Sequence, residues 1–474
     1  MKHIAIVLVL FVLLALPTTV QADVAPPEQP PGANPGPGST GTQVRMQSES
    51  VLIDVQAVAP AKSLGRALVT ADFDMFNTGS QAESMDVRFP ISGNDGFSNY
   101  PEISDLQVSV NGSAVSSRRT TGKDPFGYDD TVPWAAFAVT FPAGQVTQIR
   151  VTYTLEASGL SPYIWFYYIF STGAGWQGSI GSAELTVRLP YAANEQNVIR
   201  NQTAENSPTK AGGTILGNEI HWSYNDFEPT KADNFIIELV QPSVWQTVLK
   251  DQAAVEQNLK DGEAWGMLGK QYKQIFISPK RRGFRTYHIA TDSGAQALYA
   301  LSRQAYEQAV TLKPDDPLWH AGYADLLGYY ANFAKEEGID TSTDAVAALS
   351  QIRQALALAP ADATVRQIAD EMTFYFPDGM KANDDSYDYP WLTATPTLLP
   401  TEISVSTLNA TPTQAVIEAA TPTILEPTKA VSQQTAATPA QNAGQTSRKP
   451  FLPICGSALL LLPLGALFWR NLRT

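Results

Sequence analysis

With 474 residues, of which 44% are hydrophobic, the chain is too long for one ordinary core and has enough apolar side chains for two folded domains with tails. Its formal net charge of −14 and its pI near 4.8 argue against nucleic-acid binding, because a phosphate-binding surface needs clustered lysines and arginines. We attribute the acidity to solubility.

Residues 1–22 predict a signal peptide. An apolar run from Ile4 to Leu16 follows a positive residue, and Val20-Gln21-Ala22 fits the small-residue rule for cleavage. The mature chain is therefore expected to be exported. Residues 23–43 are rich in proline and glycine, which predicts a disordered leader.

Residues 44–241 predict an antiparallel β-sandwich. About ten short runs of alternating apolar and polar residues occur there, with turn residues between them and no long amphipathic helix that would favour parallel βαβ units. Asn111-Gly112 and Gly217-Asn218 are typical of two-residue hairpin turns, because both central positions favour residues that tolerate positive φ.

A central hairpin is expected between Tyr163 and Pro190. Its first strand, Tyr163–Phe170, is continuously apolar and should be covered on both faces. Its second strand, Ala183–Pro190, alternates and should have one wet face. The glycines between the two strands permit positive φ in the connection.

This region resembles an uncharacterised group of secreted bacterial β domains, in which an aromatic strand precedes the pattern Thr-Gly-x-x-Trp-x-Gly-x-Ile-x-x-Ala. The matching residues are Thr172, Gly173, Trp176, Gly178, Ile180 and Ala183. The resemblance implies a structural motif and transfers no activity.

Residues 243–376 predict a short α-helical domain, because the apolar period changes there from two to helical. Ser243 is expected to cap a first helix from Val244 to Asn258. The next helix resembles the first helix of a tetratricopeptide repeat. The residues that carry this resemblance, here and in the following helices, are Trp265, Leu268, Gly269, Tyr272, Tyr306, Ala309, Pro314, Trp319 and Tyr323.

The repeat spacing is irregular, since Pro314 and Pro360 lie further apart than the roughly 34 residues of a standard repeat. We therefore expect two to three degenerate repeats. The resemblance implies a concave groove that binds a peptide or a partner protein, with the aromatic residues packing the helices rather than touching the partner.

A basic cluster lies in an insertion of the expected repeats. It consists of Lys280, Arg281, Arg282 and Arg285. In an otherwise acidic chain, this cluster is either a site for an acidic partner or polymer or a solvated loop.

The C-terminal part predicts an anchor on a stalk. Residues 377–449 are rich in threonine and proline and should form a disordered stalk. Residues 450–469 are long and apolar enough for a transmembrane helix, and the arginines in residues 470–474 place this tail in the cytoplasm.

A second interpretation of the C-terminus is a cell-wall sorting signal. The residues that resemble such a signal are Leu452, Pro453, Cys455 and Gly456. Cys455 stands where that family has threonine, so we expect a membrane anchor and keep processing at this motif as the alternative. Cys455 is also the only cysteine, so the two domains should fold without a disulfide.

No pattern in the sequence predicts an enzyme. Outside the signal peptide the histidines are His221, His288 and His320, each in a different segment, and a hydrogen-bonded structural role is expected for them. There is no His-Glu-x-x-His motif, cysteine pair or nucleophile elbow in the sequence. We therefore expect no catalytic residue, no metal and no cofactor.

The function we expect is that of a bacterial cell-surface protein that binds or scaffolds a protein or peptide partner through its helices. One alternative is a surface for carbohydrate or cell-wall polysaccharide, formed by the rings of Tyr163, Trp165 and Trp176. The other alternative is a hydrolase with a site between the two domains.

Overall fold

The computed structural model describes residues 41–58, 63–93, 102–124, 131–199, 209–282, 289–384 and 386–393, which belong to one compact unit within residues 1–400. The predicted signal peptide, transmembrane helix and cytoplasmic tail lie outside the described residues, as does the predicted stalk from residue 394 onward. So do Leu452, Pro453, Cys455 and Gly456 of the sorting-like motif. Residues 377–384 and 386–393, which belong to the predicted disordered stalk, are described and form two short strands and a short helix. The helical region therefore extends beyond the boundary that the sequence predicted at residue 376. Within the described part of the chain, no helix combines the length and the apolar character that crossing a membrane requires.

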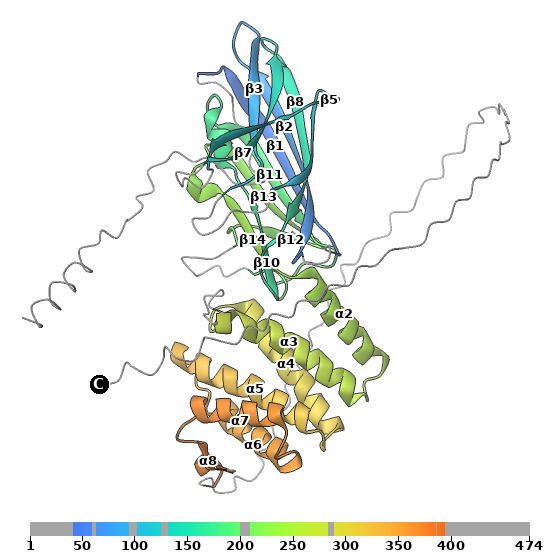
Figure 1. Cartoon of the computed structure of the whole chain (residues 1–474), viewed down its shortest axis with the longest axis vertical. Helices are drawn as coiled ribbons and strands as arrows, with labels where there is room; N and C mark the ends of the chain where they lie inside the picture. The colour runs from blue at the N-terminus through green and yellow to red at the C-terminus, as the bar shows by residue number, and fades with distance from the viewer. Residues whose placement is uncertain are drawn as a thin grey trace, which may run out of the picture. The chain divides into compact units, whose positions relative to one another are not determined.

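The chain has an α+β architecture in which β-sheets precede helices (Figure 1). The strands that build the three larger sheets are β1 (Val44–Val55), β2 (Arg66–Asn77), β3 (Glu83–Pro90), β4 (Ser104–Val110), β5 (Ser113–Val115), β6 (Arg118–Lys123), β7 (Thr131–Phe141), β8 (Val146–Glu156), β9 (Ser158–Leu160), β10 (Tyr163–Tyr168), β11 (Ile180–Arg188), β12 (Thr214–Leu216), β13 (Glu219–Phe227) and β14 (Phe235–Val240). The elements that follow are α2 (Pro242–Gln257), α3 (Gly262–Arg282), α4 (Ser293–Leu312), α5 (Pro317–Ala334), α6 (Ser342–Leu358), α7 (Ala363–Tyr375), the short strands β15 (Lys381–Ala382) and β16 (Tyr387–Asp388), and α8 (Pro390–Thr393).

The largest sheet has eight strands in the order β12-β13-β11-β1-β2-β8-β4-β5. Its central strands alternate between buried and partly exposed side chains. In β2, for example, Ala67, Val69, Ala71, Phe73 and Met75 are buried, and the residues between them are partly or fully exposed. Because successive side chains of a strand point to opposite faces, one face of this sheet belongs to the core and the other is polar.

Two three-stranded sheets cover the buried face. One has the order β3-β7-β6 and the other β14-β10-β9. The ring of Phe89 on β3 lies 5.6 Å from that of Tyr153 on β8. The ring of Trp222 on β13 lies 4.8 Å from that of Phe235 on β14. Apolar contacts between sheets therefore hold the strand region together.

Both predicted two-residue hairpin turns are confirmed. Asn111 and Gly112 join β4 to β5 with φ of 50° and 78°, and Gly217, with φ of 64°, and Asn218 join β12 to β13. The left-handed backbone at Asn111, Gly112 and Gly217 explains why asparagine and glycine occupy these three positions.

The predicted hairpin between Tyr163 and Pro190 is wrong. Strand β10 pairs with β14 and β9, whereas β11 lies in the eight-stranded sheet. A 3₁₀ turn, Ser171–Gly175, lies in the connection between them, which is longer than the two to five residues of ordinary hairpin loops. The faces were predicted better than the pairing, since β10 is mostly buried and β11 has one polar face.

The eight-stranded sheet also departs from a purely antiparallel one. Strands β1 and β11 pair in parallel, in a register that sets Ser48 beside Ser182 and Asp54 beside Arg188. At the start of this pair the two backbones approach closely, because a Cβ on Gly181 would lie 2.4 Å from the carbonyl oxygen of Gln47. Glycine at position 181 makes this approach possible.

The helices begin directly after the last long strand. Ser243 does not cap the first helix, because α2 begins at Pro242 with Gln241 at its N-cap and no side-chain cap. Proline is favoured in the first helical turn, where its missing N–H costs nothing. The side chains of Asp292, Asp316 and Asp362 cap α4, α5 and α7 by accepting backbone hydrogen bonds.

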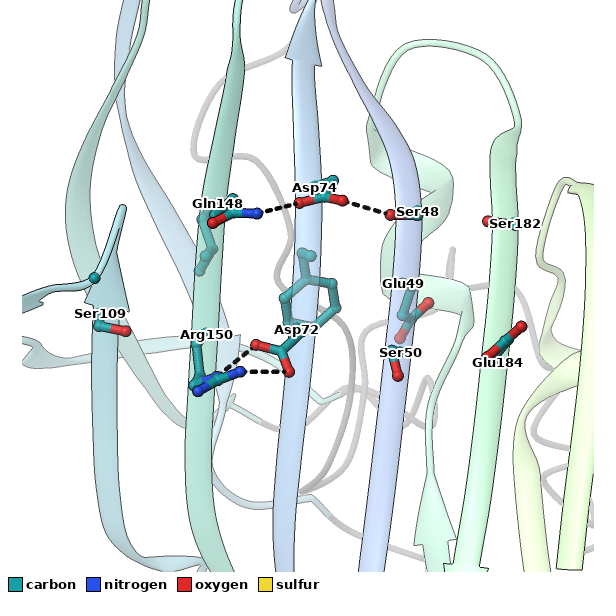
Figure 2. A pocket seen from close by; sticks show the side chains of 13 residues that line it. Ser48, Glu49, Ser50, Asp72, Asp74, Ser109, Gln148, Arg150, Ser182 and Glu184 are labelled. Carbon is teal, nitrogen blue, oxygen red and sulfur yellow. Dashed lines mark hydrogen bonds and ion pairs between the residues drawn. The ribbon is translucent and has the colours of Figure 1, made fainter. Parts of the chain in front are cut away.

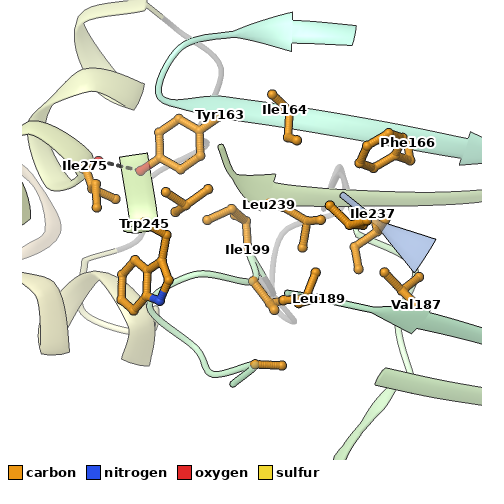
Figure 3. Packing of buried hydrophobic residues seen from close by; sticks show 14 of the residues in the cluster. Tyr163, Ile164, Phe166, Val187, Leu189, Ile199, Ile237, Leu239, Trp245 and Ile275 are labelled. Carbon is orange, nitrogen blue, oxygen red and sulfur yellow. Dashed lines mark hydrogen bonds between the residues drawn. The ribbon is translucent and has the colours of Figure 1, made fainter. Parts of the chain in front are cut away.

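Buried apolar residues continue from the strands into the helices. Figure 3 shows Tyr163 of β10, Trp245 of α2 and Ile275 of α3 in this cluster. The ring of Trp245 lies 6.3 Å from that of Tyr191, which follows β11. The strand and helical regions therefore share part of their core.

Candidate functional site

The residues expected to pack the helices lie where α3, α4 and α5 meet. The buried members of this set are Leu268, Gly269, Tyr272, Tyr306, Ala309, Trp319 and Tyr323, while Trp265 is half-buried and Pro314 is exposed. The indole N–H of Trp265 donates a hydrogen bond of 3.0 Å to the carbonyl oxygen of Leu259, just before α3.

Two glycines of α3 allow the neighbouring helices to approach. A Cβ on Gly269 would lie 3.1 Å from the ring of Tyr306, and one on Gly266 would lie 2.3 Å from the ring of Trp319. The sequence motif indicated that Gly269 packs against a neighbouring helix, without naming Tyr306 as its contact. The motif gave no signal for Gly266. This glycine lies against Trp319 on α5, whereas Tyr306 is on α4.

The tyrosines of the set face one another inside the helical region. The rings of Tyr306 and Tyr323 stack at 6.0 Å with an angle of 12°. The hydroxyl of Tyr323 donates to Glu307 Oε1 at 2.8 Å. These rings are therefore occupied by packing and are not displayed for a partner.

A buried ion pair joins α3 to α5. No pattern in the sequence predicts it. Lys273 Nζ lies 2.9 Å from Asp325 Oδ2, and the two side chains are 15% and 10% exposed. Burial by itself would lower the pKa of Lys273, but the adjacent Asp325 carboxylate outweighs it and raises this pKa. Lys273 also lies 5.7 Å from the centroid of the Tyr306 ring.

The basic cluster lies partly beyond the described residues. Lys280, Arg281 and Arg282 occupy the C-terminal end of α3, with no description of their side chains, and Arg285 lies outside the described chain. The cluster of Lys280, Arg281, Arg282 and Arg285 therefore stays a prediction.

The histidines that the structure describes are hydrogen-bonded. His320 Nδ1 lies 2.6 Å from Gln351 Oε1, and its Nε2 lies 2.8 Å from the carbonyl oxygen of Pro314. His221 Nδ1 lies 3.0 Å from the hydroxyl of Thr186. His288 lies outside the described residues.

Two of the aromatic rings considered for sugar stacking belong to the core. Tyr163 and Trp176 are 3% and 4% exposed, and Trp165 is half-buried. The ring of Trp176 packs edge-on against Phe141 at 5.9 Å. Tyr163 and Trp176 are therefore not available as a flat surface for a pyranose ring.

An apolar pocket of about 710 Å³ opens at the far end of the helical region, where the C-terminal ends of α5 and α7 meet the start of α6. We call it the helical pocket. Its lining includes Ala331, Ile339, Ala345, Val346, Tyr375, Phe376 and Trp391. Of these, Val346 and Trp391 are 38% and 37% exposed, so apolar surface is open to solvent at the pocket.

Local turns build the rim of the helical pocket. Gly338, with φ of 82°, ends the turn that follows α5, and the Ile339 N–H then donates to the carbonyl oxygen of Ala334 at 3.2 Å. The hydroxyl of Thr341 donates to the carbonyl oxygen of Ala331 at 3.0 Å. These bonds fix the connection between α5 and α6 against the end of α5.

The chain after α7 returns to form another side of the pocket. The hydroxyl of Tyr387 donates to Asp370 Oδ1 at 2.7 Å, which ties β16 to α7. Trp391 on α8 then lies 5.9 Å from the ring of Phe376. A Cβ on Gly379 would lie 2.5 Å from the Trp391 ring, so glycine is needed where the chain passes beneath it.

Among the described residues, the charged groups that line the helical pocket are two acids and one base. Asp340 and Asp378 line it together with Lys335. The backbone N–H of Ser342 donates to Asp340 Oδ1 at 3.0 Å and thereby lowers the pKa of this carboxyl. Asp340 is therefore ionised at neutral pH, and the pocket combines apolar walls with negative charge.

No protein-family model matches the chain, and no curated protein matches it in sequence. Among solved structures, the chain is similar to a proposed nutrient binding protein of Legionella pneumophila. The TM-score is 0.39 and the sequence identity is 20%, and the match covers 58% of this chain and 98% of the other.

Further similarities involve peptidases. An M1 zinc metallopeptidase of Deinococcus radiodurans matches with a TM-score of 0.24 and 9% identity over 42% of each chain. An aminopeptidase N family protein of Idiomarina loihiensis matches with a TM-score of 0.21 and 13% identity over 40% of this chain and 29% of that one. Similarities at this level carry no information on ligands or activity.

Proposed function

We propose that this protein is a non-enzymatic binding protein whose helical pocket takes an apolar side chain of a peptide or protein partner. The observation that carries the proposal is the open apolar lining of about 710 Å³, with Val346 and Trp391 more than one third exposed. Pockets of this size and composition are typical of ligand sites, and exposed apolar patches rimmed by polar residues mark interaction sites.

The charge around the helical pocket favours a basic partner segment. Asp340 and Asp378 lie on its lining, with Lys335 as the opposing charge, and the whole chain carries a formal charge of −14. We therefore propose a partner peptide in which lysine or arginine residues flank a bulky apolar side chain. Opposite charges at a rim increase the association rate and the selectivity more than the affinity.

The proposal includes the repeat-like organisation inferred from the sequence. Helices α3 with α4 and α5 with α6 follow one another as contacting pairs, and glycines of α3 contact aromatic rings of α4 and α5. This packing supports a degenerate tetratricopeptide-like array, with a β-sandwich before it. The sequence further supports display at the bacterial surface on a stalk and a membrane anchor, with the C-terminus in the cytoplasm.

The experiment compares two peptide probes. A fluorescent peptide with a central leucine flanked by lysines is titrated with the purified full-length chain, and an otherwise equal peptide with glutamates in place of the lysines is titrated in parallel. We expect the lysine peptide to bind and the glutamate peptide to bind at least tenfold more weakly.

Matched variants locate the binding. Val346→Arg places a charge on the pocket wall at a site that is already 38% exposed, and it should reduce the affinity for the lysine peptide at least tenfold. Leu318→Arg makes the same kind of change at a site that is 47% exposed, at the opposite end of α5 from the pocket, and should leave the affinity unchanged. Equal affinity of the native chain and Val346→Arg would refute the proposal.

A further inference from the structure

A second hollow lies on the polar face of the eight-stranded sheet. Its lining carries more charged and hydroxyl side chains than that of the helical pocket. The hollow encloses about 480 Å³, and we call it the sheet hollow. Figure 2 shows side chains from β4, β8, β2, β1 and β11 along it. Among the polar side chains on its lining are Ser50, Asp72, Asp74, Gln148, Arg150 and Glu184.

Strand register places these side chains in two rows. In the first row, Arg150 lies beside Asp72, Asp72 beside Ser50, and Ser50 beside Glu184. In the second row, Gln148 lies beside Asp74, Asp74 beside Ser48, and Ser48 beside Ser182. Since neighbouring strands lie about 4.8 Å apart, each row presents one polar group per strand over roughly 14 Å.

Hydrogen bonds hold the β8 and β2 side of both rows in place. Arg150 donates to both oxygens of Asp72, at 2.6 Å and 3.1 Å. Asp74 accepts from the hydroxyl of Ser48 at 2.9 Å and from Gln148 Nε2 at 3.3 Å (Figure 2). Side chains fixed in this way lose little conformational entropy when a ligand binds.

The β11 ends of the rows, together with Ser50 on β1, keep hydrogen-bonding capacity. Glu184, Ser50 and Ser182 make no side-chain hydrogen bond to another residue that the structure describes. A carboxylate only accepts hydrogen bonds, whereas a serine hydroxyl both donates and accepts, and Arg150 and Gln148 add further donors. The sheet hollow therefore offers donors and acceptors side by side.

This mixture of groups selects a class of ligand. The two rows hold three carboxylates against one guanidinium, which disfavours an anion, and their charged and hydroxyl groups disfavour an apolar ligand. Among the described residues, no group of three or more acidic, histidine or cysteine side chains is arranged to hold a metal ion. Neutral hydroxyl groups, each a donor and an acceptor, match the rows best.

We propose that the sheet hollow binds a neutral polyhydroxylated ligand, namely a short oligosaccharide that lies across strands β8, β2, β1 and β11. This site is independent of the helical pocket and of the buried rings of Tyr163 and Trp176. Without an aromatic platform, binding depends on hydrogen bonds from the two rows, with Glu184 and Asp74 as the principal acceptors.

The test uses the purified full-length chain and three neutral probes, cellotetraose, maltotetraose and chitotetraose, in isothermal titration calorimetry. At least one of them should bind, with a favourable enthalpy. Glu184→Ala removes an exposed acceptor and should weaken that binding about tenfold or more. Asp74→Asn keeps the side-chain shape and should weaken it in the same direction.

The matched control is Asp54→Ala, on the same face of β1 but two rows beyond Ser50, or about 13 Å along the strand. It should bind the probe as the native chain does, and circular dichroism melting should show all variants folded. The proposal is overturned if none of the three probes binds, or if Glu184→Ala and Asp74→Asn bind as tightly as Asp54→Ala.

Discussion

Tyr163, at the start of β10, donates its hydroxyl hydrogen bond to the backbone carbonyl oxygen of Ile275 in α3, which lies 112 residues further along the chain (Figure 3). Both residues are buried, with exposed fractions of 3% and 0%. A buried polar contact between a strand and a helix makes the strand and helical regions depend on each other, because neither group has water as an alternative partner.

Replacing Tyr163 by phenylalanine should destabilise the protein by about 1–3 kcal/mol, since the carbonyl oxygen of Ile275 would stay buried without its donor. The measurement is urea denaturation, followed by both circular dichroism and tryptophan fluorescence. Tyr387→Phe is the control, because its hydroxyl bonds to Asp370 at an exposed site and its loss should cost less. Equal effects of the two substitutions would contradict the importance of the buried contact.

Gly266→Ala should destabilise the helical region although alanine has the higher helix propensity. The added Cβ would lie 2.3 Å from the ring of Trp319, and relieving such overpacking typically costs about 1–3 kcal/mol against a propensity gain of about 1 kcal/mol. Thermal melting followed by circular dichroism measures the balance. Lys270→Ala, at an exposed position of the same helix, should change the melting temperature little.

Lys273→Met should reduce the free energy of unfolding by about 3–5 kcal/mol, because it leaves the Asp325 carboxylate buried without its partner. The double variant Lys273→Met/Asp325→Leu removes both charges and should be more stable than the single variant. A double-mutant cycle from urea denaturation gives the coupling energy. Strictly additive effects would show that the two charges do not interact.

Asp251→Asn should stabilise the protein at neutral pH. Burial raises the pKa of Asp251 above its ordinary value of 3.8, and its Oδ2 accepts no hydrogen bond from the described residues. A raised carboxyl pKa means that the ionised form is disfavoured in the folded state.

The effect of Asp251→Asn should therefore be present above the folded-state pKa and vanish below pH 3.8, where the carboxyl is protonated in both states. Melting temperatures of the two proteins at pH 7 and at pH 3 measure this. Glu256→Gln, at an exposed position of the same helix, is the control. A larger gain at pH 3 than at pH 7 would contradict the assignment.

Features that depend on neighbouring residues were predictable from the sequence. The turn at Asn111-Gly112 and the wet face of β11 follow from local backbone preferences and a period of two. The change to a helical period at Ser243 falls next to the observed start of α2 at Pro242. The repeat motif also placed Gly269 among the residues that pack the helices, and in the structure it lies against Tyr306.

Features that depend on distant residues were not predictable. The pattern of β10 shows that it is buried but does not say that β14, rather than β11, is its partner. The helical pocket collects side chains from α5, α6, α7 and α8, and each of them looks ordinary in its own segment. Lys273 and Asp325, 52 residues apart, give no sign in the sequence that they meet.

The parallel pairing of β1 with β11 has a consequence for the order of folding. Strand β2 begins 11 residues after the end of β1, whereas β11, the other neighbour of β1, is synthesised about 130 residues later. At 5–20 residues per second this delay is on the order of ten seconds. Until Ile180–Arg188 leaves the ribosome, one edge of β1 exposes unpaired backbone groups. A nascent chain that ends before β11 is therefore the form in which this strand edge can pair with another chain and aggregate. Binding of a chaperone to this form would prevent such pairing.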